Sequence, residues 1–250
     1  MFKRIIFILI LTLVGTESII FAQEELVFEP LSSGNFAVMH LSKEEKVIIN
    51  TGSSNSRKEI INYLNELEDQ RIKGILITSV NARNCGNLSY ILNQYDVDQL
   101  YLPKHNTELC KVPKDFQNQT YYLSKNERIA ISSRYYIDHV YNKNDGSSHV
   151  AISNGNFVCY WYEGNLKTSQ WDKQTQVMFL PDNPSANLTE EDLEMLNPEV
   201  AIINRRGEIQ PLIEMFQKQW VDIYALRKGV SAHINIMQEE YELYLKREES

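Results

Sequence analysis

The sequence of residues 75–87 is ILITSVNARNCGN, an apolar run that passes directly into a loop of small and polar residues. The apolar run from Gly74 to Thr78 is short and continuous, which indicates a strand. After the loop, apolar residues recur at helical spacing from Leu88 to Tyr95, with Asn87 as the expected cap. The stretch therefore predicts a strand, a polar turn and a helix in succession.

Strands and amphipathic helices alternate on both sides of this stretch. Upstream, residues 35–39 and 46–50 are β-rich runs around a charged turn, which predicts a hairpin followed by a helix after Gly52. Downstream, the Asn154-Gly155-Asn156 turn between β-rich runs predicts a second hairpin. Further strands are expected at residues 99–102, 120–123, 127–132, 134–141, 176–180, 200–204, 221–224 and 233–236, with helices at residues 189–196 and after Pro211. The pattern predicts one α/β domain of two similar halves.

Composition excludes some classes of protein. The chain has 250 residues, of which 43% are hydrophobic, so it can bury a full core and is not expected to be disordered. Its formal net charge is −8, with no Lys/Arg block beyond the first residues. Because nucleic-acid binding depends on neutralising phosphates with basic side chains, this composition disfavours nucleic acid as a partner.

The N-terminus has the pattern of an export signal. Lys3-Arg4 precede an apolar run from Ile5 to Val14, and Ala22 offers a cleavage site, so residues 1–22 are expected to be a signal peptide. The alternative is a retained membrane anchor, which Glu17 disfavours because a carboxylate is costly in hydrocarbon. Residues 23–237 are expected to form the folded domain, and residues 238–250 a charged helical or frayed tail. The chain is therefore expected to be secreted or extracytoplasmic.

Three cysteines are too few for a disulfide framework. Cys85 and Cys159 lie among apolar residues, and the favoured interpretation is that they are buried small hydrophobes. A disulfide from Cys110 to either Cys85 or Cys159 remains an alternative. The histidines show no metal-type spacing and are expected to have separate roles; they are His40, His105, His139, His149 and His233.

Several motifs, taken in chain order, carry a resemblance to a known family. An apolar-Asp-x-Gly strand end is matched by residues 48–52, and a Thr-His-x-His-x-Asp-His-x-Gly-Gly loop by residues 78–87. An apolar strand closed by Gly-Asp is matched near residues 160–164, and an apolar-Pro-His-His-Gly-Ser turn by residues 180–185. The chain resembles the metallo-β-lactamase fold, within it the soluble domain of competence DNA-uptake channel (ComEC-type) proteins. This resemblance implies a four-layer αββα sandwich.

The same resemblance implies that the metal ligands have been replaced. Family histidines fall on Ser79, Asn81 and Asn84, the metal-binding aspartate falls on Arg83, and the later histidine pair falls on Asp182 and Asn183. Zinc prefers imidazole, thiolate or carboxylate donors, and a guanidinium repels a dication. A full ligand set contributes about 10–16 kcal/mol of apparent zinc binding, and here one carboxylate remains. We therefore expect no catalytic residues, no metal and no cofactor.

The expected function is binding by a catalytically inactive member of the fold, with a protein, an envelope component or a small ligand as partner. The former metal cleft would be lined by Asn50, Ser79, Asn81, Arg83, Asn84 and Asp182, and Arg83 is expected to pair with Asp182. The favoured interpretation of the dispersed carboxylates Asp145, Glu163, Asp172 and Asp182 is a solvated face, and their gathering of a hard cation such as Ca²⁺ stays open. One alternative function is a metal-dependent hydrolase with a non-standard site. The other alternative function is that of a DNA-uptake accessory protein. A pair of arginines, Arg205-Arg206, is expected to lie in an exposed loop.

Overall fold

The structure is a computed structural model, and it describes residues 24–67, 71–141, 148–164, 171, 173–182, 188–204, 209–237 and 240–247. The expected signal peptide at residues 1–22 lies outside the described residues, and so do Asp145, Asp172, Asn183 and the Arg205-Arg206 pair. Within the described part of the chain, no helix is long and apolar enough to cross a membrane.

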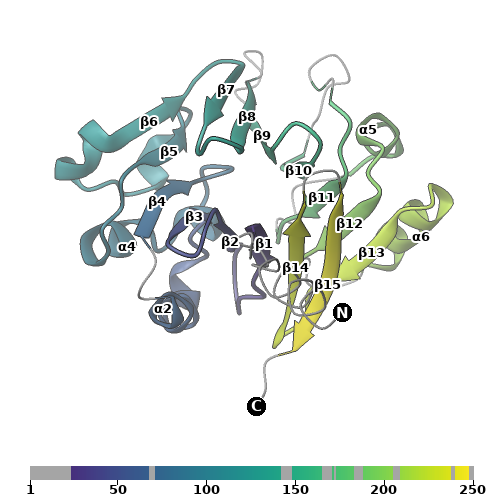
Figure 1. The fold of residues 1–250 in the computed structure, drawn as a ribbon, viewed down its shortest axis with the longest axis horizontal. Helices are drawn as coiled ribbons and strands as arrows, with labels where there is room; N and C mark the ends of the chain where they lie inside the picture. The colour runs from purple at the N-terminus through teal and green to yellow at the C-terminus, as the bar shows by residue number, and fades with distance from the viewer. Residues whose placement is uncertain are drawn as a thin grey trace, which may run out of the picture.

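Two mixed β-sheets form the centre of the fold (Figure 1). The first has the strand order β15-β14-β1-β2-β3-β4-β5-β6. Its strands are β1 (Glu24–Phe28), β2 (Ala37–His40), β3 (Glu45–Ile49), β4 (Arg71–Leu76), β5 (Leu100–Pro103), β6 (Thr120–Leu123), β14 (Val230–Ile236) and β15 (Tyr241–Arg247). The second has the order β13-β12-β11-β10-β9-β8-β7. Its strands are β7 (Glu127–Ala130), β8 (Tyr136–Tyr141), β9 (Ser148–Ser153), β10 (Val158–Trp161), β11 (Val177–Leu180), β12 (Val200–Ile203) and β13 (Asp222–Ala225).

Helices cover the outer face of each sheet. The helices of the first half are α2 (Arg57–Glu66), α3 (Ala82–Cys85) and α4 (Leu88–Gln94), and those of the second are α5 (Glu190–Leu196) and α6 (Gln210–Lys218). Short 3-10 turns are η1 (Ser54–Ser56), η2 (Thr107–Leu109) and η3 (Lys114–Gln119). Ile60 and Leu64 of α2 pack with Ile48 of β3, while Leu193 of α5 packs with Met178 of β11. The predicted four-layer αββα sandwich is therefore confirmed.

The core between the two sheets follows from the period-2 alternation of apolar residues along the strands. Leu26 and Phe28 of β1 point into it, where the Phe28 ring stacks on Phe179 with a centroid distance of 4.8 Å. Both predicted hairpins form, β2 with β3 and β9 with β10. The start of α5 carries a capping box between Thr189 and Asp192, at the beginning of the chain segment for which a helix is predicted.

Two expectations about the ends of the sheet are corrected. The segment after residue 237 was expected to be a helical or frayed tail, but Tyr241–Arg247 forms β15, which pairs along its whole length with β14. Charged residues obscure the alternation of Tyr241, Leu243 and Leu245, whose side chains lie on one face of the strand. Strand β1 was not predicted, and it lies between β14 and β2, so the first described strand pairs with a strand from near the end of the described chain.

Candidate functional site

The candidate site lies where strands of both sheets reach their carboxyl ends, the usual position of binding sites in α/β folds. Each of these strands is followed by a polar residue. The residues are Asn50 after β3, Thr78 after β4, Glu163 after β10, Asp182 after β11 and Asn204 after β12. They come from turns that are far apart in the sequence, so the fold alone brings them to one edge.

Asn50 and Thr78 join the two neighbouring strands of the first sheet. The Asn50 side-chain oxygen accepts the Thr78 N–H at 2.9 Å, and its amide nitrogen donates to Thr78 Oγ1 at 3.0 Å. Both side chains are buried. Asn50 has a φ of 61°, a left-handed conformation that asparagine tolerates better than most residues. Asn50 thus closes a strand end, with both its amide oxygen and its amide nitrogen hydrogen-bonded to Thr78.

Glu163 links this pair to the loop after β4. Its Oε1 accepts the Thr78 hydroxyl at 2.7 Å and the Asn84 side-chain N–H at 3.1 Å. The sequence places Glu163 only among the dispersed carboxylates and does not predict it in the cleft. A signal for its position was present, because Glu163-Gly164 follows the apolar strand that the family closes with Gly-Asp, in reversed order.

Asn35 is the central residue of the network, and the predicted lining of the cleft did not include it. Its amide nitrogen donates to Asn84 Oδ1 at 2.8 Å. Its oxygen accepts the Asp182 main-chain N–H at 2.7 Å and the Asn204 side-chain N–H at 3.0 Å. These bonds join the two halves of the sandwich through buried amides, which are costly to leave unpaired.

The hypothesis that Arg83 pairs with Asp182 is confirmed. The guanidinium donates to the Asp182 main-chain carbonyl at 3.0 Å, and also to its carboxylate. The Asp182 side chain is 10% exposed and that of Arg83 is 42% exposed. The ion pair therefore has its carboxylate inside the site and its cation at the surface.

Ser79 and Asn81 lie at the rim of the site, and the structure gives Asn81 a local role. The Asn81 side-chain oxygen accepts the main-chain N–H groups of Arg83 and Asn84 at 2.9 and 3.1 Å, so it caps α3. Its amide nitrogen donates to the Ser79 hydroxyl at 3.1 Å. Ser79 also borders a hollow of about 130 Å³ with Glu163 and His105, which is smaller than typical ligand pockets.

Close approach of three loops holds the network in place. Gly34, with a φ of 85°, has the Arg83 carbonyl oxygen 2.3 Å from the position a Cβ would occupy. A Cβ on Gly86 would lie 2.5 Å from the main-chain nitrogen of Ser54. Only glycine fits at either position, because larger residues would overlap backbone atoms that have no rotamer to change.

A disulfide between Cys85 and Cys110 anchors the loop that carries Arg83 and Asn84. This corrects the favoured interpretation of Cys85 as an unbridged small hydrophobe and settles the pairing of Cys110. Cys159 is a free, buried cysteine as expected, and its burial raises the pKa of its thiol well above the usual range. It packs between the sheets, away from the strand ends.

The residues present do not fit the zinc centre that the fold implies. The Glu163 carboxylate accepts two protein hydrogen bonds, the Asp182 carboxylate is paired with a guanidinium, and the other groups are amides and hydroxyls. Among the described residues, no group of three or more His, Cys, Asp or Glu side chains is placed to hold a metal ion. The histidines bond elsewhere, His149 to Tyr160 and His233 to Glu25. A dication here would have to displace Arg83 and break the bonds of Asn84.

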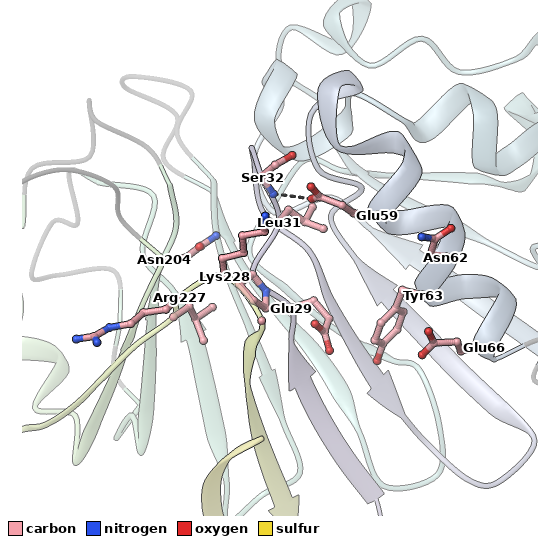
Figure 2. Close-up of a pocket in the computed structure, with 13 residues that line it drawn as sticks. Glu29, Leu31, Ser32, Glu59, Asn62, Tyr63, Glu66, Asn204, Arg227 and Lys228 are labelled. Carbon is pink, nitrogen blue, oxygen red and sulfur yellow. Dashed lines mark hydrogen bonds between the residues drawn. The ribbon is translucent and has the colours of Figure 1, made fainter. Parts of the chain in front are cut away.

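A larger hollow than the one beside Ser79 lies next to this network, and Asn204 borders both the hollow and the network. It has a volume of about 830 Å³, and α2, the turn after β1 and the turn between β13 and β14 enclose it. Figure 2 shows Glu29, Tyr63 and Glu66 on one side, with Lys228 reaching toward Leu31 and Arg227 turned away. Burial raises the pKa of Tyr63, and the nearby carboxylates of Glu29 and Glu66 add to the increase. The sequence did not predict this pocket.

Comparisons with known proteins show the fold and nothing finer. No protein-family description matches the sequence, and no curated protein matches it. The metallo-beta-lactamase fold protein YhfI from Bacillus subtilis has a TM-score of 0.59 at 7% identity, over 84% of this chain and 100% of that chain. A motif mutant of a Cronobacter sakazakii metallo-beta-lactamase has a TM-score of 0.46 at 11% identity, over 78% and 85%. Zn(2+)-bound PqqB from Methylobacterium extorquens has a TM-score of 0.42 at 12% identity, over 75% and 63%.

Proposed function

We propose that this protein, which has the metallo-β-lactamase fold, acts by binding a partner and has lost the metal-dependent hydrolysis of its family. The observation that carries the proposal is the Arg83–Asp182 ion pair at two positions where the family places metal ligands. A guanidinium neither donates an electron pair to zinc nor tolerates a dication at its contact distance. Without the metal, a water molecule has no Lewis acid to lower its pKa toward 7.

The pocket of about 830 Å³ beside the network is the binding site in this proposal. Its volume falls in the range of about 300–1,000 Å³ typical of ligand sites. Carboxylates of Glu29, Glu59 and Glu66 line it together with Lys228. This mixed lining supports a polar or charged partner, which includes an envelope component, a segment of a protein or a small ligand.

Location outside the cytoplasm is part of the proposal. The export pattern of residues 1–22 supports this location. The Cys85–Cys110 disulfide supports it as well, because disulfides persist mainly in oxidising compartments. Because the sequence resembles competence DNA-uptake channel domains, a DNA-handling role is an alternative that needs a test. A net charge of −8 weighs against that role.

Elemental analysis of the protein purified without added metal tests the proposal, with a zinc-loaded enzyme of the same fold as the positive control. We expect no stoichiometric transition metal and no change in the unfolding temperature when a chelator is added. Two metal ions per chain, with hydrolysis that the chelator abolishes, would establish the hydrolase alternative. Salt-sensitive binding of duplex DNA in the same preparation would establish the DNA-uptake alternative.

A further inference from the structure

Strand β15 (Tyr241–Arg247) forms one edge of the first sheet, and β14 is its only neighbour in the described part of the chain. It carries large exposed side chains, with Tyr244 38% and Leu245 44% exposed. Beside it lies a mostly apolar hollow of about 550 Å³, to which Leu245, Ile213 and Ile223 contribute. A long edge with exposed apolar groups is a template for pairing with another strand.

The pattern of hydrogen bonds between β14 and β15 determines which backbone N–H and C=O groups of β15 face away from β14 and are available at the edge. The Met237 N–H donates to the Glu240 carbonyl at 2.9 Å, so these two residues form a hydrogen-bonded pair. Because such pairs alternate along antiparallel strands, the even-numbered residues of β15 bond to β14. The odd-numbered residues direct their N–H and C=O groups to the open edge; they are Tyr241, Leu243, Leu245 and Arg247.

We propose that this edge binds a second copy of the chain, with the two β15 strands antiparallel around a two-fold axis at Tyr244. In this register Glu242 lies opposite Lys246 of the second copy, and Lys246 opposite its Glu242. Leu243 lies opposite Leu245, and Tyr241 opposite Arg247. The outward-directed backbone groups of the odd-numbered residues face one another, as an antiparallel ladder requires.

The side chains favour this register over its neighbours. An axis at Glu242 or at Lys246 would place like charges directly opposite, which is destabilising. An axis at Leu243 or Leu245 would separate Glu242 from Lys246. Tyr244 at the proposed axis is already fixed within its own chain, because its ring stacks on His233 with a centroid distance of 5.1 Å and its hydroxyl donates to Glu25 at 2.7 Å. Both interactions lie on the face opposite the core, so the edge stays open.

Charge reversals test the proposal through the molar mass of the full chain in sedimentation equilibrium. The unchanged chain is expected to be a dimer. E242K alone, or K246E alone, places two like-charge pairs across the axis and should weaken association on the order of 100-fold. An equimolar mixture of the two variants should form a heterodimer, and the double variant E242K/K246E should recover the homodimer.

Lys58→Glu on the exposed face of α2 serves as the matched control and should leave the dimer unchanged. Circular dichroism and thermal unfolding of each variant show whether it remains folded. The proposal is overturned if the unchanged chain is monomeric at every concentration. Single reversals that stay dimeric, or a mixture and a double variant that stay monomeric, would also overturn it. None of these outcomes depends on metal content or on the ligand pocket.

Discussion

The Arg83 guanidinium donates to two oxygens of Asp182, the main-chain carbonyl at 3.0 Å and the carboxylate, and so joins the loop after β4 to the turn after β11. The two residues are 99 positions apart in the sequence. Because their contact crosses from one half of the sandwich to the other, it helps to hold the two halves together.

Replacing Arg83 by Gln should lower the free energy of unfolding by about 1–2 kcal/mol, because the nearly buried Asp182 carboxylate loses its charged donor. Urea unfolding of Arg83→Gln, Asp182→Asn and the double variant measures the coupling. The matched control is Arg71→Gln, since the side chains of the Arg71–Asp98 pair are 60% and 31% exposed, and solvent screening should make its loss much smaller. Equal losses at Arg83 and Arg71 would contradict a structural role for the site pair.

Gly86→Ala should cost about 3 kcal/mol, although its φ is ordinary and alanine favours helices. The added Cβ would lie within 2.8 Å of backbone atoms of Ser53, Ser54 and Ala82. Gly155→Ala is the comparison, because nothing lies within 4 Å of its Cβ position and only the strain of its φ of 93° remains, about 1 kcal/mol. Chemical denaturation of both variants checks the order, and a larger loss at Gly155 would refute the close packing of the loops.

Removing the Cys85–Cys110 disulfide should lower stability by about 3 kcal/mol, since it closes a loop of 25 residues in the unfolded chain. The measurement is thermal unfolding with and without reductant, together with a thiol count under denaturing, non-reducing conditions. We expect one thiol per chain, from Cys159. Reductant should leave the Cys85→Ala/Cys110→Ala variant unchanged, and three titratable thiols in the native protein would contradict the bridge.

Lys46 makes stability depend on alkaline pH. Burial lowers the pKa of Lys46 to about 8, and its amine donates to the Leu67 carbonyl at 2.8 Å. Between pH 8 and its ordinary value near 10.5, the unfolded chain binds more protons than the folded one, so stability should rise with pH by about 2–3 kcal/mol. Lys46→Met should abolish this rise in urea titrations at several pH values. A rise that persists in the variant would assign it to another group.

Much of the fold was predictable because strands and helices each impose a characteristic spacing of apolar residues along the chain. The run before Thr78 and the spacing after Asn87 predicted β4 and α4 correctly. Strand β15 is not evident in the sequence because only Tyr241 and Leu243 are partly buried, and the charged residues between and after them conceal the alternation. The sequence does not decide the disulfide, because the spacing of the cysteines does not say which of them meet.

Part of the candidate site was also predictable from the sequence, and part was not. Position in the motif order predicted the Arg83–Asp182 contact, whereas Asn35 and Glu163 were absent from the predicted lining. Asn35 bonds to Asn204, which is 169 residues away. No local pattern connects them, because a hydrogen bond depends on a separation of about 3 Å that only the packed sheets create.

By itself, the sequence determined the types of residue at the strand ends and the order of the strands and helices between β2 and β14, because side-chain chemistry and backbone periodicity are local properties. The tertiary structure alone decided that Asn35, Asn84, Glu163 and Asp182 meet and satisfy one another, and that β15 ends the sheet with an open edge. These features require distant segments to pack against each other, and packing is a property of the whole folded chain.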